Sequence, residues 1–136
     1  MKCLMHLIVI LLFSTTFSSC EVDINKRIEG VWVIDNMTYL NQPCMDAFLV
    51  NMIDFEKKDV IIPTRRGYHN YRGIDTAYWT AKKVEGVFEM KIKSIDPVFN
   101  RTFIITYDHP NKYKNPTMIL SSDSVKIYCT KTPTFL

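Results

Sequence analysis

The sequence predicts an all-β fold, an eight-stranded antiparallel up-and-down barrel, and three observations support this prediction. Aromatic and β-branched residues are frequent, turn residues separate them into short runs, and no segment has the period of a long amphipathic helix. Strands joined by short links favour a meander, which removes its exposed edges by closing into a barrel. A two-sheet β-sandwich is the alternative, because strand counts alone do not separate the two.

Eight strands are expected between residues 28 and 130. They are Ile28–Tyr39, Leu49–Glu56, Asp59–Pro63, Ile74–Ala81, Val84–Ser94, Thr102–Asp108, Thr117–Ser121 and Ser124–Thr130. Apolar and polar residues alternate from Phe88 to Lys93 and from Val125 to Thr130, which is typical of strands with one buried face. In the sixth strand the alternation is less decisive, because Ile104 lies on the face opposite to its hydrophobic neighbours.

The side chains expected to face the barrel interior are large and apolar. They are Trp32, Ile34, Ile53, Phe55, Trp79, Phe88, Met90, Phe103, Ile105 and Leu120. An eight-stranded barrel encloses a space that such side chains fill, or that holds one small ligand. Both alternatives stay open from the sequence.

The first twenty residues, MKCLMHLIVILLFSTTFSSC, have the layout of a secretory signal peptide. Lys2 provides a basic start, Leu4–Phe13 is almost wholly apolar, and small polar residues follow. A transmembrane helix needs about 20 apolar residues, roughly twice the length of this run. We therefore expect residues 1–19 to be a signal peptide, residues 20–27 to be a polar tether, and residues 28–136 to form the single domain.

The end of this segment resembles a bacterial lipobox. Small Ser18 and Ser19 directly precede Cys20, and bulky Phe17 argues against ordinary signal cleavage at this point. The resemblance implies that Cys20 is acylated and holds the protein on a membrane of the bacterial cell envelope, which we expect to be the outer membrane. Several acyl chains would make a firm anchor.

Net charge and cysteine content bear on two further questions, whether the protein binds nucleic acid and whether it contains a disulfide. The chain has 17 basic and 14 acidic residues, and Lys2 would leave with the signal peptide, so near balance gives no reason to expect a nucleic-acid partner. Cys44 and Cys129 would remain in an oxidising compartment, where a disulfide is one alternative. The other alternative is a free, buried Cys129. Cys44 lies in the first loop, at the mouth, whereas Cys129 is expected about 17 Å down the last strand from the mouth. A disulfide requires Cα atoms within about 7 Å of each other.

The stretch Gly30-Val31-Trp32 resembles the G-x-W signature that opens the first strand of lipocalins. The whole layout is similar to the small lipocalin-like lipoproteins of Bacteroidota, in which a basic residue, here Lys131, ends the last strand. The resemblance implies that Trp32 plugs the closed base of the barrel and that Gly30 lets the chain pass close by. Classical lipocalins have Arg where this chain has Lys131.

The third loop, TRRGYHNYRG, is the candidate ligand site. In an up-and-down barrel, the first, third and fifth loops ring the mouth, opposite to the tethered base. Guanidinium groups bind anions and tyrosine offers a flat face and a hydroxyl. The candidate ligand-binding residues are Arg65, Arg66, Tyr68, His69, Tyr71, Arg72 and the interior Trp79. A solvated hairpin tip is the alternative interpretation of this loop.

No motif of catalysis, metal binding or cofactor binding is present, so we expect neither enzymatic activity nor a cofactor. The resemblance implies a membrane-tethered lipoprotein that binds a small apolar or amphipathic ligand at the barrel mouth. The alternative is an envelope protein-interaction or inhibitor domain, with a filled barrel and no small-molecule ligand.

Overall fold

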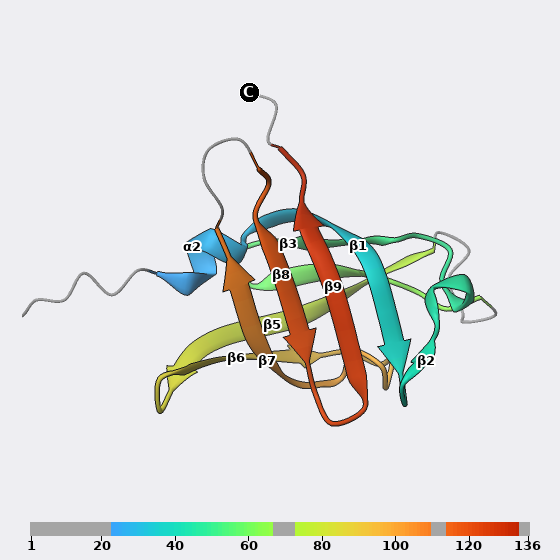
Figure 1. Ribbon diagram of the computed structural model, residues 1–136. Coiled ribbons are helices and arrows are strands. Elements are labelled where there is room, and N and C mark those ends of the chain that lie inside the picture. The colour runs from blue at the N-terminus through green and yellow to red at the C-terminus, as the bar shows by residue number, and fades with distance from the viewer. Residues whose placement is uncertain (1–22, 67–72, 110–113, 134–136) are drawn as a thin grey trace, which may run out of the picture.

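The computed structural model describes residues 23–66, 73–109 and 114–133, and strands dominate it (Figure 1). A short helix, α2 (Ile24–Ile28), precedes the first strand, and a 3₁₀ turn, η1 (Met45–Ala47), follows the second. The strands are β1 (Gly30–Tyr39), β2 (Gln42–Pro43), β3 (Met52–Phe55), β4 (Asp59–Pro63), β5 (Ile74–Val84), β6 (Val87–Lys93), β7 (Arg101–Asp108), β8 (Thr117–Ser121) and β9 (Val125–Lys131). Within these described ranges, no helix has the length and apolar character needed to cross a bilayer.

The strands from β1 to β9 form one antiparallel sheet that closes on itself. From β3 to β9 each strand pairs with the next along the chain, and β1 pairs with β3 on one side and with β9 on the other, from Trp32 opposite Lys131 to Tyr39 opposite Val125. The prediction of an eight-stranded antiparallel barrel is therefore confirmed, and the sandwich alternative is excluded. The extra strand is the two-residue β2, which pairs with the end of β1 inside a segment expected to be a loop.

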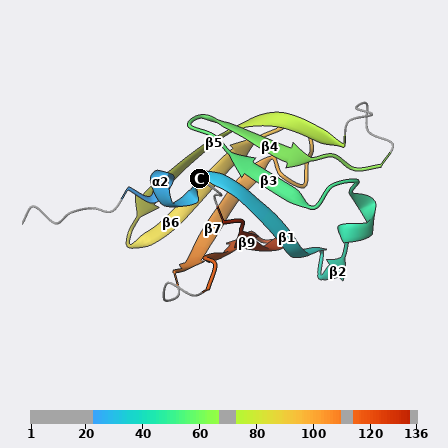
Figure 2. The same cartoon turned by 90° about the horizontal axis from the view of Figure 1, so that it is seen from above.

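The segment expected to be a polar tether contains α2. Asp23 caps this helix by accepting a hydrogen bond from the Asn25 backbone N–H at 3.1 Å. Ile24 and Ile28, four residues apart on one helix face, are both buried in the core. The first strand consequently begins at Gly30 rather than at Ile28. Figure 2 shows α2 and β2 at opposite ends of the barrel.

The barrel interior is filled by the inward side chains of all eight strands. Of the ten residues expected there, nine are at most 5% exposed and Phe88 is partly buried against them. The sixth expected strand, β7, now has a clear orientation, because Ile105 is 5% exposed and Ile104 is 50% exposed. The alternation of the sequence therefore reproduces the inward and outward faces of the barrel wall.

The base of the barrel is closed around Trp32. Its indole N–H donates a hydrogen bond to the Ile28 carbonyl at 2.6 Å, and the ring of Tyr107 meets it edge-on at 6.1 Å. The Lys131 ammonium lies 5.4 Å from the Trp32 ring centroid and donates to the Arg27 carbonyl at 2.7 Å. Lys131 thus covers the ring of Trp32 at the base, and burial lowers the pKa of Lys131.

Gly30 is needed for this arrangement. Its φ is +112°, which disfavours any residue with a side chain, and an added Cβ would come within 3.4 Å of Lys131 Cε. Close passage of the chain beside the Trp32 plug, implied by the lipocalin resemblance, is present in the structure.

Substitutions of the two neighbouring isoleucines of β7 test which side chains of this strand face the barrel interior. We expect Ile105→Ala to lower the free energy of unfolding by about 2–4 kcal/mol, because it leaves a cavity in the filled interior. Ile104→Ala should lower it by about 1 kcal/mol or less, because half of this side chain is already in water. Urea unfolding of both variants measures the difference, and equal losses would contradict the assigned faces.

Candidate functional site

Only part of the predicted ligand site lies in the described residues. Arg65 and Arg66 are at the mouth, between β4 and β5, whereas Tyr68, His69, Tyr71 and Arg72 lie outside the described residues and their role stays a prediction. Described residues of four connections meet at this end of the barrel: residues 40–51, 64–66 with 73, 94–100 and 122–124.

Trp79 does not belong to the mouth, which corrects the sequence-based assignment. β5 begins at the mouth with Ile74, and five residues along a strand correspond to about 17 Å. The Trp79 indole N–H donates to the Glu56 carbonyl at 2.6 Å, in the turn between β3 and β4 at the base, and its ring contacts Phe55 edge-on. Trp79 is a core residue that closes the lower half of the barrel.

Arg65 spans the mouth to a carboxylate on another loop. Its Nε lies 3.1 Å from Oδ2 of Asp96, whose side chain is 4% exposed. The other oxygen of Asp96 accepts the Val98 backbone N–H at 2.8 Å. Because both carboxylate oxygens have donors, this buried charge is compensated. Arg65 therefore ties the third loop to the fifth, rather than standing open to an anionic ligand.

Two phenylalanines cover the interior beneath this ion pair. Phe48, from the first loop, and Phe99, from the fifth, pack edge-on with centroids 5.9 Å apart, and both are buried. The backbone joins the first and third loops through a bridge between Phe48 and Arg65, and the Arg66 N–H donates to the Ala47 carbonyl at 2.8 Å. In the described part of the mouth, side chains occupy the entrance to the barrel.

Arg101 fixes the fifth loop to the turn between β8 and β9. Its guanidinium donates to Oγ of Ser122 at 3.2 Å, to Oγ of Ser124, and to the Pro97 carbonyl at 2.6 Å. Asp123, a highly exposed residue, completes the group at 3.4 Å. All four connections at the mouth are thus linked by side-chain or backbone contacts, apart from any contribution of the residues outside the described ranges.

The two remaining cysteines are free in this structure, so the alternative of a bridge is not the one observed. The Cys44 thiol lies 3.5 Å from the Met37 carbonyl, whereas Cys129 is opposite Ile34, further down the same strand. Burial raises the pKa of both thiols, and that of Cys129 to about 12; nearby Arg65 opposes the rise at Cys44. Cys129 is a core residue of the barrel interior.

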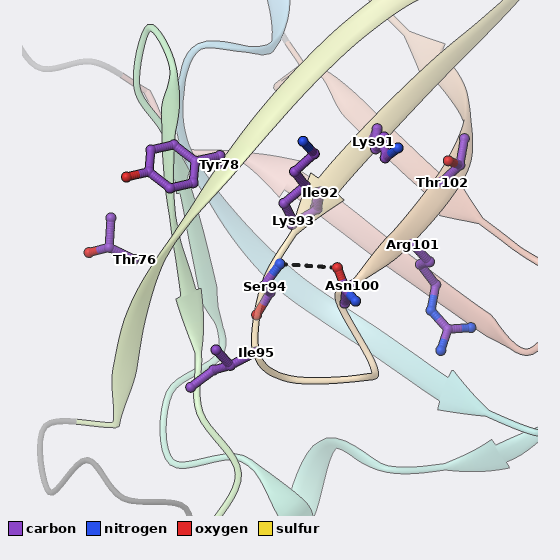
Figure 3. Close-up of a pocket in the computed structure, with 10 residues that line it drawn as sticks. All are labelled: Thr76, Tyr78, Lys91, Ile92, Lys93, Ser94, Ile95, Asn100, Arg101 and Thr102. Atoms are coloured by element: carbon purple, nitrogen blue, oxygen red, sulfur yellow. Dashed lines mark hydrogen bonds between the residues drawn. The ribbon is translucent and has the colours of Figure 1, made fainter.

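A shallow groove of about 580 Å³ lies on the outer face of the barrel, over β5, β6 and β7 (Figure 3). Its wall residues are mostly cationic, hydroxyl-bearing or aromatic: Thr76, Tyr78, Lys91, Lys93, Ser94, Ile95, Asn100, Arg101 and Thr102. Sequence reasoning identified Lys91 and Lys93 as outward-facing but missed this groove. The missing information is the register of three strands, which places Tyr78 opposite Lys93 and Lys91 opposite Thr102.

The described residues offer no group of three or more His, Cys, Asp or Glu side chains arranged to hold a metal ion. What the groove offers is hydrogen-bond donors, positive charge and one exposed aromatic ring.

The ion pair at the mouth leads to a first prediction for this region, on the stability of variants that lack one carboxylate. Asp96→Ala should lower the free energy of unfolding by about 1–3 kcal/mol, because it leaves Arg65 and the Val98 N–H without their acceptor. Asp123→Ala, which removes an exposed carboxylate from Arg101, should cost about 0.5 kcal/mol or less. Urea unfolding compares the two, and similar losses would show that the Arg65–Asp96 pair does not hold the mouth closed.

Cys129 makes a second prediction, on the pH dependence of stability. The unfolded chain releases this thiol proton near pH 9 and the folded chain near pH 12, so its stabilisation is complete below about pH 9 and is lost as pH rises toward 12. We expect the free energy of unfolding to fall by roughly 1 kcal/mol per pH unit above pH 9, relative to a Cys129→Val variant. If the free energies of unfolding of the two proteins changed in parallel with pH, the assignment of Cys129 as a buried thiol with a raised pKa would be wrong.

Comparisons with known proteins add no family to this description. No protein-family model matches the chain, and neither a curated protein nor a solved structure matches it. The structure itself shows a closed eight-stranded antiparallel barrel, through its strand order and the pairing of β1 with β9.

Proposed function

We propose that this chain is a lipid-anchored binding module of the bacterial cell envelope, with a filled barrel as its scaffold and its binding surface on the outside. The observation that carries this proposal is the packing of the interior. Trp32, Phe55 and Phe103 are among the side chains that fill it with at most 1% exposure. An eight-stranded barrel has an interior that side chains can just fill.

The two ends of the barrel support the same proposal. At the base, α2 and Lys131 pack around Trp32; at the mouth, Phe48 and Phe99 cover the core beneath the Arg65–Asp96 pair. A small apolar ligand would have to displace these contacts to enter. Of the two functions considered from the sequence, the geometry favours the domain that acts through its surface.

The proposed anchor gives the module an orientation. Cys20 precedes α2 by three residues, and α2 packs at the base beside Trp32. A lipid on Cys20 would therefore hold the base near the membrane and leave the mouth loops and the side wall accessible. This orientation suits a protein that meets a partner at the envelope.

Two experiments test the proposal. Cys20→Ala should abolish incorporation of labelled fatty acid and release the protein to the soluble fraction, whereas Cys44→Ala, the matched cysteine control, should leave both unchanged. Fatty-acid labelling that persists in Cys20→Ala would contradict the anchor.

The filled interior is tested by native mass spectrometry. The expected mature chain, with Cys20→Ala and exported from its own host behind an ordinary secretory signal, should be purified without detergent and should show the mass of the polypeptide alone. A co-purified small molecule at one per chain would overturn the proposed mode of binding.

A further inference from the structure

We infer that the groove over β5, β6 and β7 binds an acidic glycan, meaning a chain of sugar rings that carry carboxylate or sulfate groups. This inference rests on the proposed function and names the class of partner for its outer surface.

Positive charge predominates among the residues that line the groove. Lys91 and Lys93 both point outward from β6 and are exposed, and within the described ranges neither makes an ion pair. Two acidic residues lie next to the groove, Glu89 two residues before Lys91 on the same face of β6 and Asp59 opposite Tyr78, and neither lines it. Two unpaired ammonium groups on one strand attract a ligand with repeated negative charges.

Tyr78 gives the groove a flat apolar surface. Its side chain is 65% exposed and stands directly opposite Lys93, on the neighbouring strand. Figure 3 shows its ring at one side of the groove, with the β5 ribbon between the ring and the labelled side chains of β6. An exposed aromatic ring beside charged groups combines an apolar face with a polar tip, which suits the C–H face of a sugar ring whose substituents are polar.

The remaining wall supplies neutral hydrogen-bonding groups. Thr76 and Thr102 are exposed hydroxyl groups on the outer strands of the groove. The side-chain oxygen of Asn100 accepts the Ser94 N–H at 3.3 Å, which orients its amide at the mouth end of the groove (Figure 3). Hydroxyl and amide groups around a charged centre match the hydroxyl groups of a sugar.

The sheet geometry favours a glycan over an acidic peptide. Peptides commonly bind to sheets by adding a strand to an open edge. Each of the three strands under the groove is already paired on both sides, β5 with β4 and β6, and β7 with β6 and β8. Recognition there depends on side chains alone, and these side chains offer a ring, hydroxyl groups and cations.

Calorimetric titration of the expected mature chain, with Cys20→Ala, tests the inference. The probes are an oligomer of galacturonic acid, a sulfated dextran oligomer, neutral dextran, a poly-glutamate peptide and vesicles containing phosphatidylglycerol. We expect binding of at least one acidic glycan and weaker binding of the other three probes. Tighter binding of poly-glutamate or of the vesicles, or no binding of either acidic glycan, would overturn the inference.

Matched variants show whether binding occurs in the groove. Lys91→Gln combined with Lys93→Gln should weaken glycan binding about tenfold, because two charge-assisted contacts are lost, and Tyr78→Ala should weaken it about fivefold. Lys57→Gln combined with Lys58→Gln removes the same charge from the exposed turn before β4, and Tyr39→Ala removes another exposed ring; both should change affinity less than about twofold. Equal losses in the groove and control variants would mean that net charge alone binds the glycan.

The outcome is separable from that of the proposed function. If no acidic glycan binds, but Cys20 carries lipid and the interior holds no small molecule, then the anchored module stands and only its partner class is wrong. If a small molecule co-purifies, the proposed mode of binding fails whatever the glycan titration shows.

Discussion

The pairing of β1 with β9 is the constraint on which the rest of the structure depends. It joins the beginning of the sheet to its end over the length of both strands, from Trp32 opposite Lys131 to Tyr39 opposite Val125. Closure leaves no long free edge and fixes the interior volume of an eight-stranded barrel, which side chains just fill. The same pairing delivers Lys131 to the face of Trp32, so one contact closes the sheet and seals the base.

Local patterns in the sequence predicted the strands and the side chains that face inward. Alternation along β6 and β9 and the G-x-W stretch at Gly30 depend on neighbouring residues, and each reappears in the structure at the expected place. β7 shows the limit of such patterns. Ile105 is expected to face inward with Phe103, but Ile104 on the opposite face is equally apolar, and the exposed fractions of 5% for Ile105 and 50% for Ile104 come only from the structure.

Contacts between residues far apart in the chain could not be predicted from such local patterns. Arg65 has the chemistry of an anion-binding residue, but its partner is Asp96, 31 residues later in another loop. Trp79 is a large interior aromatic residue that the sequence places among the candidate ligand-binding residues. Only the strand register shows that it lies near the base of the barrel and not at the mouth. The outer groove likewise needs three strands in register before Tyr78, Lys91 and Lys93 form one surface.

Under the proposed function, the closed ends and filled core make the barrel a scaffold that apolar molecules do not enter. The most direct measurement is a titration of the mature chain with dodecanol, followed by NMR of the interior methyl groups of Ile34, Ile53 and Leu120. The account predicts that these methyl resonances do not move. Saturable shifts at one dodecanol per chain would contradict it, because they would place the ligand inside the barrel.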